Sequence, residues 1–199
     1  IKRDINQIKV FYRTLGYYFV KIDAKIEKLK KNKVNILYKL DKGEKAKIAK
    51  IYFLGDKKMR DNKLRDIITS QESRFWKFIS RNVYLNVQRI ELDKRLLENY
   101  YRNQGYYEAS ITSSNVEYSE GEGFVLTYSI EAGKRYKFNK IYASVSEALD
   151  QNAFLALGDE FNKLIGKYYS QIKLNNLLEE IDKLTEQKEL QFINHNVEE

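Results

Sequence analysis

Apolar and polar residues alternate over two pairs of segments in this chain. The apolar positions of the first pair are Tyr18, Val20, Ile22, Ala24 and Ile26, then Val34, Ile36, Tyr38 and Leu40. Those of the second pair are Tyr107, Ala109 and Ile111, then Phe124, Leu126, Tyr128 and Ile130. Successive side chains of a strand point to opposite faces, so each segment predicts a half-buried β-strand.

A helical period precedes each pair of predicted strands. The apolar positions of the first helix are Ile1, Ile5, Ile8, Tyr12 and Leu15. A second helix starting near Gln88 carries Leu92, Leu96, Leu97, Tyr100 and Tyr101. Gly16 and Gly105 follow these helices at the position where a left-handed residue ends a helix. The spacing predicts one apolar stripe along each helix.

The two regions are copies of one unit. Residues 11–18 read FYRTLGYY and residues 100–107 read YYRNQGYY, an offset of 89 positions. Residues 50–52 recur as 140–142, and the strand from Val34 maps onto the strand from Phe124 at one constant offset. A period this long is typical of small domains in tandem rather than of a solenoid.

The second copy supplies the complete order of elements. A strand over Lys47–Leu54 is followed by a helix that Asp61 or Asn62 caps and whose apolar face is Leu64, Ile67 and Ile68. The second helix and two strands complete a β-α-α-β-β module. We therefore predict an α+β fold of tandem modules, each a three-stranded mixed sheet covered on one face by two helices.

Three modules are expected along the chain. Residues 1–44 form the C-terminal half of a module, residues 45–132 a complete module, and residues 133–199 a third, truncated module. The third is predicted to contain a strand with Phe138, Ile141 and Tyr142, a short helix over Ala153–Leu157, a helix from Ile172 to Leu184, and a strand from Leu190 to Val197. Ile1 begins in mid-pattern, so we expect the chain to be part of a longer protein.

Composition narrows the function classes. The chain has no cysteine, which excludes disulfides and thiolate metal sites, and no apolar run long enough to span a bilayer. The net charge of +8 is compatible with nucleic acid or anionic lipid as a partner, or with a lysine-rich solvated surface. We expect no nucleic-acid partner and no cofactor.

Catalytic and metal sites are not predicted. The single histidine, His195, has no partner residues in a triad or zinc pattern. Glu120 and Glu122 flank a predicted hairpin turn, which offers no cleft for a pair of catalytic carboxylates. The chain is therefore predicted not to be an enzyme.

Aromatic residues allow two interpretations each. The tyrosines at the helix ends, with Arg13 and Arg102 beside them, could stack single-stranded nucleic acid, but their helical spacing favours packing in the core. Phe75, Trp76 and Phe78 form either a docking patch or a plug between the helices and the sheet.

An edge strand is the favoured binding site. An open three-stranded sheet has two edges with unpaired backbone groups, to which an extended peptide can add as a further strand. In the complete module the favoured edge is the strand from Tyr107 to Glu117. The predicted binding residues are Tyr107, Glu108, Ala109, Ser110, Ile111, Thr112 and Ser113.

The ordered set of motifs resembles the POTRA domains of BamA-type outer-membrane β-barrel assembly factors. The motifs are Ile51–Asp56, Leu64–Ser70, Glu72–Ser73, Phe75–Phe78, Asp93–Leu97, Tyr100–Tyr101 with Gly105–Tyr106, and Gly133–Phe138. The complete module looks like the third POTRA domain, flanked by the end of the second and most of the fourth. The third copy departs from the pattern, with Glu189 and Leu190 where the family has Gly and Tyr.

The resemblance implies a periplasmic portion of a Gram-negative outer-membrane protein, ahead of a membrane-embedded barrel. It implies that the modules bind outer-membrane assembly lipoproteins and unfolded outer-membrane proteins as partners. A related role in two-partner secretion or in a translocation-assembly transporter remains an alternative, as does a basic nucleic-acid-binding module.

Overall fold

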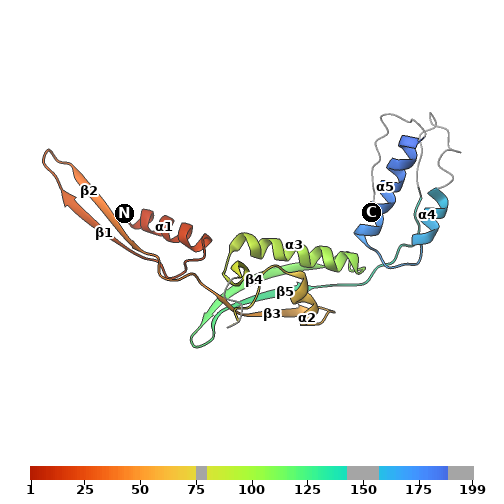
Figure 1. Ribbon diagram of the computed structural model, residues 1–199, viewed down its shortest axis with the longest axis horizontal. Helices are drawn as coiled ribbons and strands as arrows, with labels where there is room; N and C mark the ends of the chain where they lie inside the picture. The colour runs from red at the N-terminus through yellow and green to blue at the C-terminus, as the bar shows by residue number, and fades with distance from the viewer. Residues whose placement is uncertain (75–79, 143–156, 188–199) are drawn as a thin grey trace. The chain divides into compact units, whose positions relative to one another are not determined.

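The chain divides into two compact units. The computed structural model describes residues 1–74, 80–142 and 157–187. One unit comprises Ile1–Leu97 with Ile111–Glu131, and the other comprises Glu98–Ser110 with Ala132–Glu199. Figure 1 labels the helices and strands. No helix among the described residues is long and apolar enough to cross a bilayer.

The first unit begins with a helix and a hairpin. Helix α1 (Lys2–Thr14) precedes strands β1 (Lys21–Lys28) and β2 (Val34–Asp41), which pair antiparallel. The Tyr38 hydroxyl donates a hydrogen bond of 2.8 Å to Asp4 Oδ2 and so joins β2 to α1. No residue of α1 is buried. This segment has the α-β-β order that the two periods predict.

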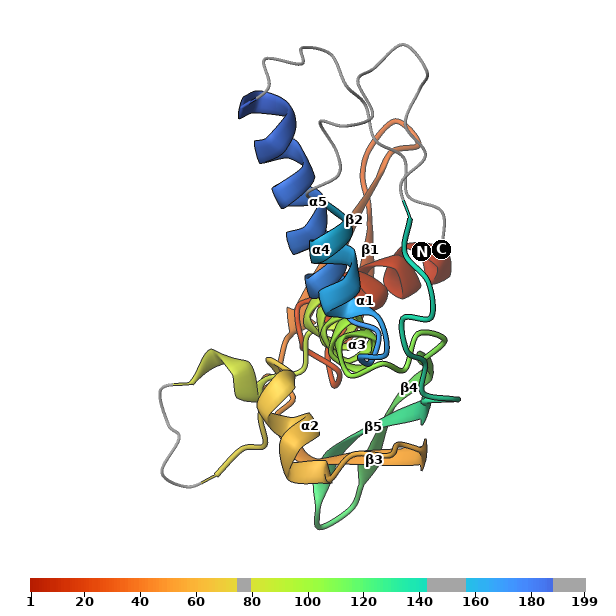
Figure 2. The same ribbon diagram turned by 90° about the vertical axis from the view of Figure 1, so that its right-hand side faces the viewer.

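A three-stranded sheet follows. It consists of β3 (Ile48–Asp56), β4 (Ser110–Ser119) and β5 (Gly123–Glu131) in the order β3-β5-β4, with β3 parallel to β5. Helix α2 (Asp61–Ile67), the 3₁₀ helix η1 (Arg81–Val83) and helix α3 (Val87–Asn103) stand between β3 and β4 in the sequence. Figure 2 shows α2 and α3 on the same face of the sheet. The predicted β-α-α-β-β order and mixed sheet are confirmed.

The core of this unit lies between the sheet and its helices. The buried strand residues are Ile48, Ile51 and Phe53 of β3, Ile111 of β4, and Phe124, Leu126, Tyr128 and Ile130 of β5. Tyr52 and Leu54 remain 43% and 56% exposed, so alternate β3 residues point to the solvated face. The alternation from Phe124 to Ile130 therefore predicts the buried face of β5 correctly.

Helix α3 buries a more polar face than predicted. Its residues with at most 6% exposure include Ile90, Asp93, Leu97 and Tyr101, whereas Leu92 is 39% exposed. These four positions are spaced by three, four and four residues, which keeps them on one side of a helix. The predicted stripe is wrong at Leu92 because the inner face includes Asp93 instead.

The helix caps also differ from expectation. The N-cap of α2 is Arg60, which makes no side-chain cap hydrogen bond, and Asp61 is the first helical residue. Asp61 forms an ion pair with Lys57 instead of capping the helix. At the start of α3, Asn86 Oδ1 accepts the N–H of Arg89 at 2.9 Å, which is the usual N-cap geometry.

The second unit contains helices α4 (Leu157–Leu164) and α5 (Gln171–Gln187). Phe161 and Leu177 are buried between them. The side chains packed against this pair are Ile141, Leu164, Leu174, Ile181 and Leu184. Ile172, which the helical period placed on the apolar face, is 57% exposed.

The predicted first strand of the third module is wrong for residues 138–142. Its segment has only an isolated antiparallel bridge between Lys137 and Tyr168. The Phe138 N–H donates to Lys167 O at 3.0 Å, and Phe138 O accepts from the Gly166 N–H at 2.8 Å. The backbone groups are thus satisfied by a turn rather than by a neighbouring strand. The predicted strand from Leu190 to Val197 and most of the predicted helix over Ala153–Leu157 lie outside the described residues.

Candidate functional site

One edge of the three-stranded sheet is covered by its own chain. The Ile51 N–H donates to Glu72 Oε1 at 3.1 Å, and Ile51 O accepts from Arg65 Nη2 at 2.9 Å. The Ser73 N–H donates to the carbonyl of Ile48 at 2.7 Å. These bonds occupy backbone groups on the outer side of β3. An incoming strand would have to displace them before pairing there.

The opposite edge is β4. Among the described residues, β4 neighbours β5 on one side and no strand on the other. Thr112, Ser113, Asn115, Glu117 and Tyr118 are exposed. Polar side chains and a charge are common on edge strands, where they discourage uncontrolled pairing. The sheet therefore has one closed and one open edge, and the open one is the edge predicted to bind.

The predicted binding segment divides at Ser110. Ser110, Ile111, Thr112 and Ser113 lie on β4, but Tyr107, Glu108 and Ala109 precede it. The Ala109 N–H donates to Tyr106 O at 3.1 Å in a turn. The start of the predicted strand is therefore wrong by three residues, because alternation alone does not separate this turn from the strand.

The residues before β4 contact the linker that follows β5 and the segment between α4 and α5. The Tyr107 ring lies 5.0 Å from the Tyr169 ring and 6.4 Å from the Tyr136 ring. A hydrogen bond from Tyr136 to Glu108 raises the pKa of Tyr136 above its ordinary value. Tyr107 and Glu108 thus hold the linker in place, and their part in peptide binding remains a prediction.

A cluster of aromatic rings lies at the far end of β4. Phe19 contacts Tyr118 and Phe124, with centroid distances of 5.2 and 5.5 Å, and Tyr18 lies 5.1 Å from Phe124. Phe19 and Tyr118 remain 54% and 56% exposed. No local pattern of the sequence predicts this cluster, because Phe19 lies about 100 residues from Tyr118 and Phe124. It provides an apolar surface beside the open edge.

A buried carboxylate fixes the helices to the sheet. Asp93 is fully buried, and its Oδ1 accepts the Thr69 N–H at 2.6 Å and the Thr69 hydroxyl at 2.7 Å. Its Oδ2 accepts the Ser70 N–H at 3.2 Å and the Tyr128 hydroxyl at 2.9 Å. Burial, and next the negative charge of Asp93, raise the pKa of Tyr128 far above its ordinary value. The network joins α3, the segment after α2, and β5.

The glycine after each long helix accepts the same backbone hydrogen bond from the linker. Gly16 O accepts from the Ala46 N–H at 2.8 Å, and Ala46 O accepts from the Leu85 N–H at 2.9 Å. In the second unit, Gly105 O accepts from the Tyr136 N–H at 2.8 Å, and Tyr136 O accepts from the Tyr169 N–H at 3.0 Å. The sequence repeat is therefore also a repeat of junction geometry.

Cations stack on tyrosines at both junctions. Lys45 Nζ lies 5.4 Å from the centre of the Tyr17 ring. At the corresponding place in the second unit, the Arg135 guanidinium lies 5.7 Å from the Tyr106 ring and 3.4 Å from the Tyr168 ring. These are cation–π distances. Tyr17 and Tyr106 are thus half-buried at the helix–strand junctions, and Tyr101 lies in the core as predicted. The core prediction is wrong for Tyr12, because no residue of α1 is buried.

Among the other candidates from the sequence, only Glu120 and Glu122 lie within the described residues. Phe75, Trp76 and Phe78 lie outside the described residues, as does His195. Glu120 and Glu122 are exposed on the turn between β4 and β5. Within the described part of the chain, no group of three or more metal-ligating residues could hold an ion.

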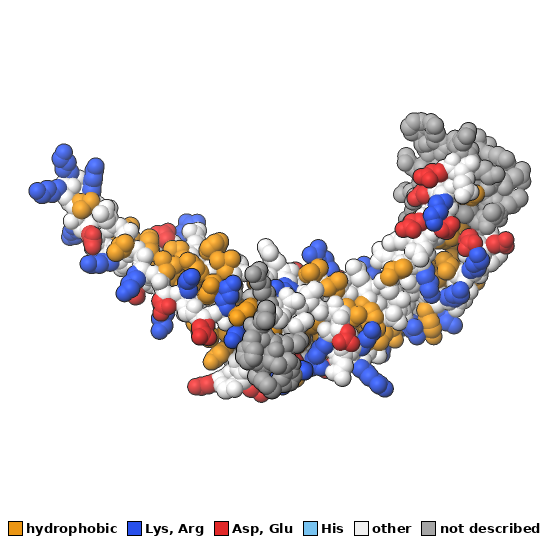
Figure 3. Space-filling view, in the orientation of Figure 1, with side chains coloured by type: hydrophobic (Ala, Val, Ile, Leu, Met, Phe, Trp, Pro, Cys, Tyr) orange, Lys and Arg blue, Asp and Glu red, His pale blue; other side chains and the backbone are white. Residues whose placement is uncertain are grey.

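Hydrophobic side chains are exposed on the first segment of the chain. They are Val10 and Phe11 of α1, Leu15 at the C-cap of that helix, and Ile26, Leu29, Val34, Ile36, Leu37 and Leu40 of the hairpin. Figure 3 shows hydrophobic side chains among the lysines of this segment. Nothing among the described residues covers these side chains.

The comparisons with known proteins agree with this architecture. Residues 46–133 match the family model for POTRA, described as surface antigen variable number repeat. Outer membrane protein assembly factor BamA of Neisseria meningitidis serogroup B is 25% identical over 186 residues, covering 91% of this chain and 23% of that protein. BamA of Buchnera aphidicola subsp. Acyrthosiphon pisum is 28% identical over 141 residues, covering 69% of this chain and 22% of that protein.

A solved structure shares the fold. The crystal structure of Haemophilus influenzae BamA POTRA3-5 has a TM-score of 0.50 and 14% identity, and covers 98% of this chain and 72% of that one. Residues 46–133 therefore form a POTRA domain. The similarity to BamA extends over 91% of the chain, and BamA homologues are Gram-negative outer-membrane proteins with periplasmic POTRA domains. The chain spans less than a quarter of the two relatives described above.

Proposed function

We propose that this chain is a binding scaffold of an outer-membrane protein assembly factor. In this proposal it captures partner subunits and unfolded β-barrel precursors by adding their extended segments to β4. The observation that carries the proposal is the asymmetry of the sheet: its own chain covers the β3 edge, while no described strand flanks the outer side of β4. POTRA domains of BamA-type proteins are a non-catalytic scaffold family, which is consistent with a binding role.

Strand addition fits the substrates of such a scaffold. Main-chain hydrogen bonds depend little on sequence, and transmembrane barrel strands share only an alternation of apolar and polar residues. Each bond contributes about 1 kcal/mol net, so a few bonds give weak and reversible capture after ordering costs. Phe19 and Tyr118 add an apolar surface at one end of the edge, where alternate side chains of the guest strand can pack.

Proline in β4 is expected to weaken binding of a barrel-strand peptide. The pair Thr112→Pro and Ser113→Pro removes one backbone donor each, and adjacent donors of a strand point to opposite sides. One variant therefore loses a bond to the guest strand, while the other loses a bond within the sheet. The outward variant is expected to bind a peptide of about ten residues about fivefold more weakly, as the loss of one bond worth about 1 kcal/mol requires. Fluorescence anisotropy of a labelled peptide measures this effect.

The control is the fold of each variant, followed by circular dichroism. The outward variant should keep its melting temperature within a few degrees, whereas the inward variant should melt earlier. Unchanged peptide affinity in both variants, with the fold intact, would exclude β4 as the binding edge. The assignment of the chain to the POTRA family would be unaffected by that result.

A further inference from the structure

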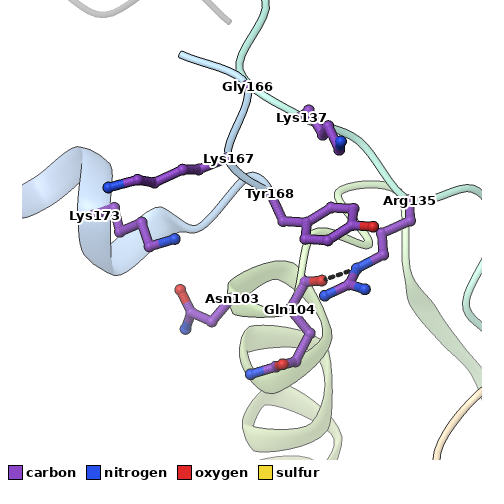
Figure 4. Close-up of a pocket in the computed structure, with 8 residues that line it drawn as sticks. All are labelled: Asn103, Gln104, Arg135, Lys137, Gly166, Lys167, Tyr168 and Lys173. Carbon is purple, nitrogen blue, oxygen red and sulfur yellow. Dashed lines mark hydrogen bonds between the residues drawn. The ribbon is translucent and has the colours of Figure 1, made fainter. Parts of the chain in front are cut away.

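A cationic pocket lies in the second unit, beside the end of α3. Its volume is about 480 Å³. The lining residues are Asn103, Gln104, Arg135, Lys137, Gly166, Lys167, Tyr168 and Lys173, drawn in Figure 4. Four of the eight are cations and none is acidic. The pocket therefore concentrates positive charge on the walls of one concave surface.

The cations of the pocket are not neutralised by the protein. None of Arg135, Lys137, Lys167 and Lys173 forms an ion pair within the described part of the chain. Elsewhere in the same unit, Lys163 pairs with Glu160 and Lys183 pairs with Glu180. In the part of the chain that the structure describes, the four cations of the pocket therefore lack the acidic partners that other lysines of this unit have. Their positive charge can attract an anionic ligand.

Arg135 is held in a fixed orientation. Its Nε donates to Gln104 O at 2.7 Å, and its guanidinium stacks 3.4 Å from the centre of the Tyr168 ring. Figure 4 shows this hydrogen bond and the stacked ring. The terminal nitrogens have no hydrogen-bond partner among the described residues. They remain available as a planar pair of donors, the geometry that binds two oxygens of one anion.

Asn103 adds a neutral donor. Its Oδ1 accepts from the Ser170 hydroxyl at 3.2 Å and from the Ile172 N–H at 2.9 Å. The Asn103 amide oxygen therefore accepts hydrogen bonds from the start of α5, and the amide nitrogen can donate to a ligand in the pocket. Figure 4 shows Lys173 extending from α5 toward Asn103. The polar groups left available in the pocket are therefore mainly hydrogen-bond donors.

We propose that this pocket binds a phosphate group, either as a free phosphate or on the headgroup of a lipid. A phosphate presents three or more acceptor oxygens and up to two negative charges, whereas a carboxylate presents two oxygens and one charge. The pocket matches phosphate better than carboxylate, because the fixed Arg135 guanidinium, the Asn103 amide and the lysines offer several donors and positive charges. The pocket volume exceeds that of a bare ion, so a phosphate ester with an attached organic group also fits.

The test is a titration of the ¹⁵N-labelled chain followed by two-dimensional NMR. Inorganic phosphate is added at constant ionic strength, with sodium chloride as the matched salt. Saturable shifts are expected at the amides of Gln104, Arg135 and Tyr168. Arg135→Ala should weaken binding at least about tenfold, because it removes a bidentate charged contact. Lys45→Ala removes one charge from the corresponding place in the other junction and should leave the affinity unchanged.

Further arms identify the source of the phosphate and can overturn the proposal. A lipid headgroup is assigned if the chain co-sediments with vesicles of phosphatidylglycerol but not with vesicles of phosphatidylcholine, and if Arg135→Ala weakens this binding. Phosphate saturation without vesicle binding assigns a free phosphate. Hexaglutamate binding in place of phosphate would overturn the proposal in favour of an acidic peptide. Shifts that do not saturate, or that spread equally over the lysines of both units, would also refute it.

Discussion

Replacing Asp93 with alanine is expected to lower the free energy of unfolding by about 3–5 kcal/mol. The carboxylate is fully buried and accepts hydrogen bonds from Thr69, Ser70 and Tyr128. Alanine leaves these donors without a partner in a dry site, where each unsatisfied group costs about 1–3 kcal/mol. Urea denaturation followed by circular dichroism measures the loss.

Glu91 provides the matched control on the same helix. Its side chain is 55% exposed and pairs with Lys94, so Glu91→Ala should change stability by about 0.5 kcal/mol or less. Tyr128→Phe removes one of the donors and should cost about 1 kcal/mol in the wild type, and less in the Asp93→Ala background. Equal stability of Asp93→Ala and Glu91→Ala would show that the network does not hold the helices to the sheet.

Gly55→Ala is expected to destabilise the sheet by about 3 kcal/mol. Gly55 has a φ of +87°, and a Cβ atom there would lie 2.4 Å from the carbonyl oxygen of Ile130, its partner on β5. The obstacle is a backbone atom of the paired strand, so the strands must separate to admit the methyl group. Differential scanning calorimetry should show a lower melting temperature.

Gly121→Ala is the control that distinguishes backbone strain at positive φ from a steric clash of the new Cβ atom. Gly121 has a similar φ of +89°, but a Cβ atom there meets nothing within 4 Å. It should therefore cost only the conformational strain, about 1–2 kcal/mol. If both variants lose the same stability, the close approach of Gly55 to Ile130 is not what requires glycine at that position.

The order of elements could be predicted because it depends on local patterns. Alternation from Phe124 to Ile130 gives β5 and its buried face, and the repeat around Gly16 and Gly105 gives the tandem arrangement. The helical spacing of apolar residues predicts helix α3, but it does not predict which of its residues are buried. The sequence alone predicts a surface position for Asp93, because an aspartate is rarely buried without hydrogen-bond donors. The fold supplies these donors from Thr69, Ser70 and Tyr128.

The state of the two sheet edges could not be predicted from the sequence. Closure of β3 depends on Arg65 of α2 and on Glu72 and Ser73 of the segment that follows it, and all three bond to backbone atoms of β3. The aromatic cluster of Phe19 and Tyr118 likewise depends on a contact across 99 positions of the sequence. Such contacts arise from tertiary packing, which no local periodicity encodes.

The most direct test of strand addition is amide hydrogen exchange of this chain with and without a barrel-strand peptide. At saturating peptide, alternate amides between Ser110 and Tyr118 should exchange at least about tenfold more slowly, because alternate donors of β4 pair with the guest. The β3 amide of Ile51, already bonded to Glu72, should not change. Protection on β3, or none along β4 while the peptide is bound, would contradict the account.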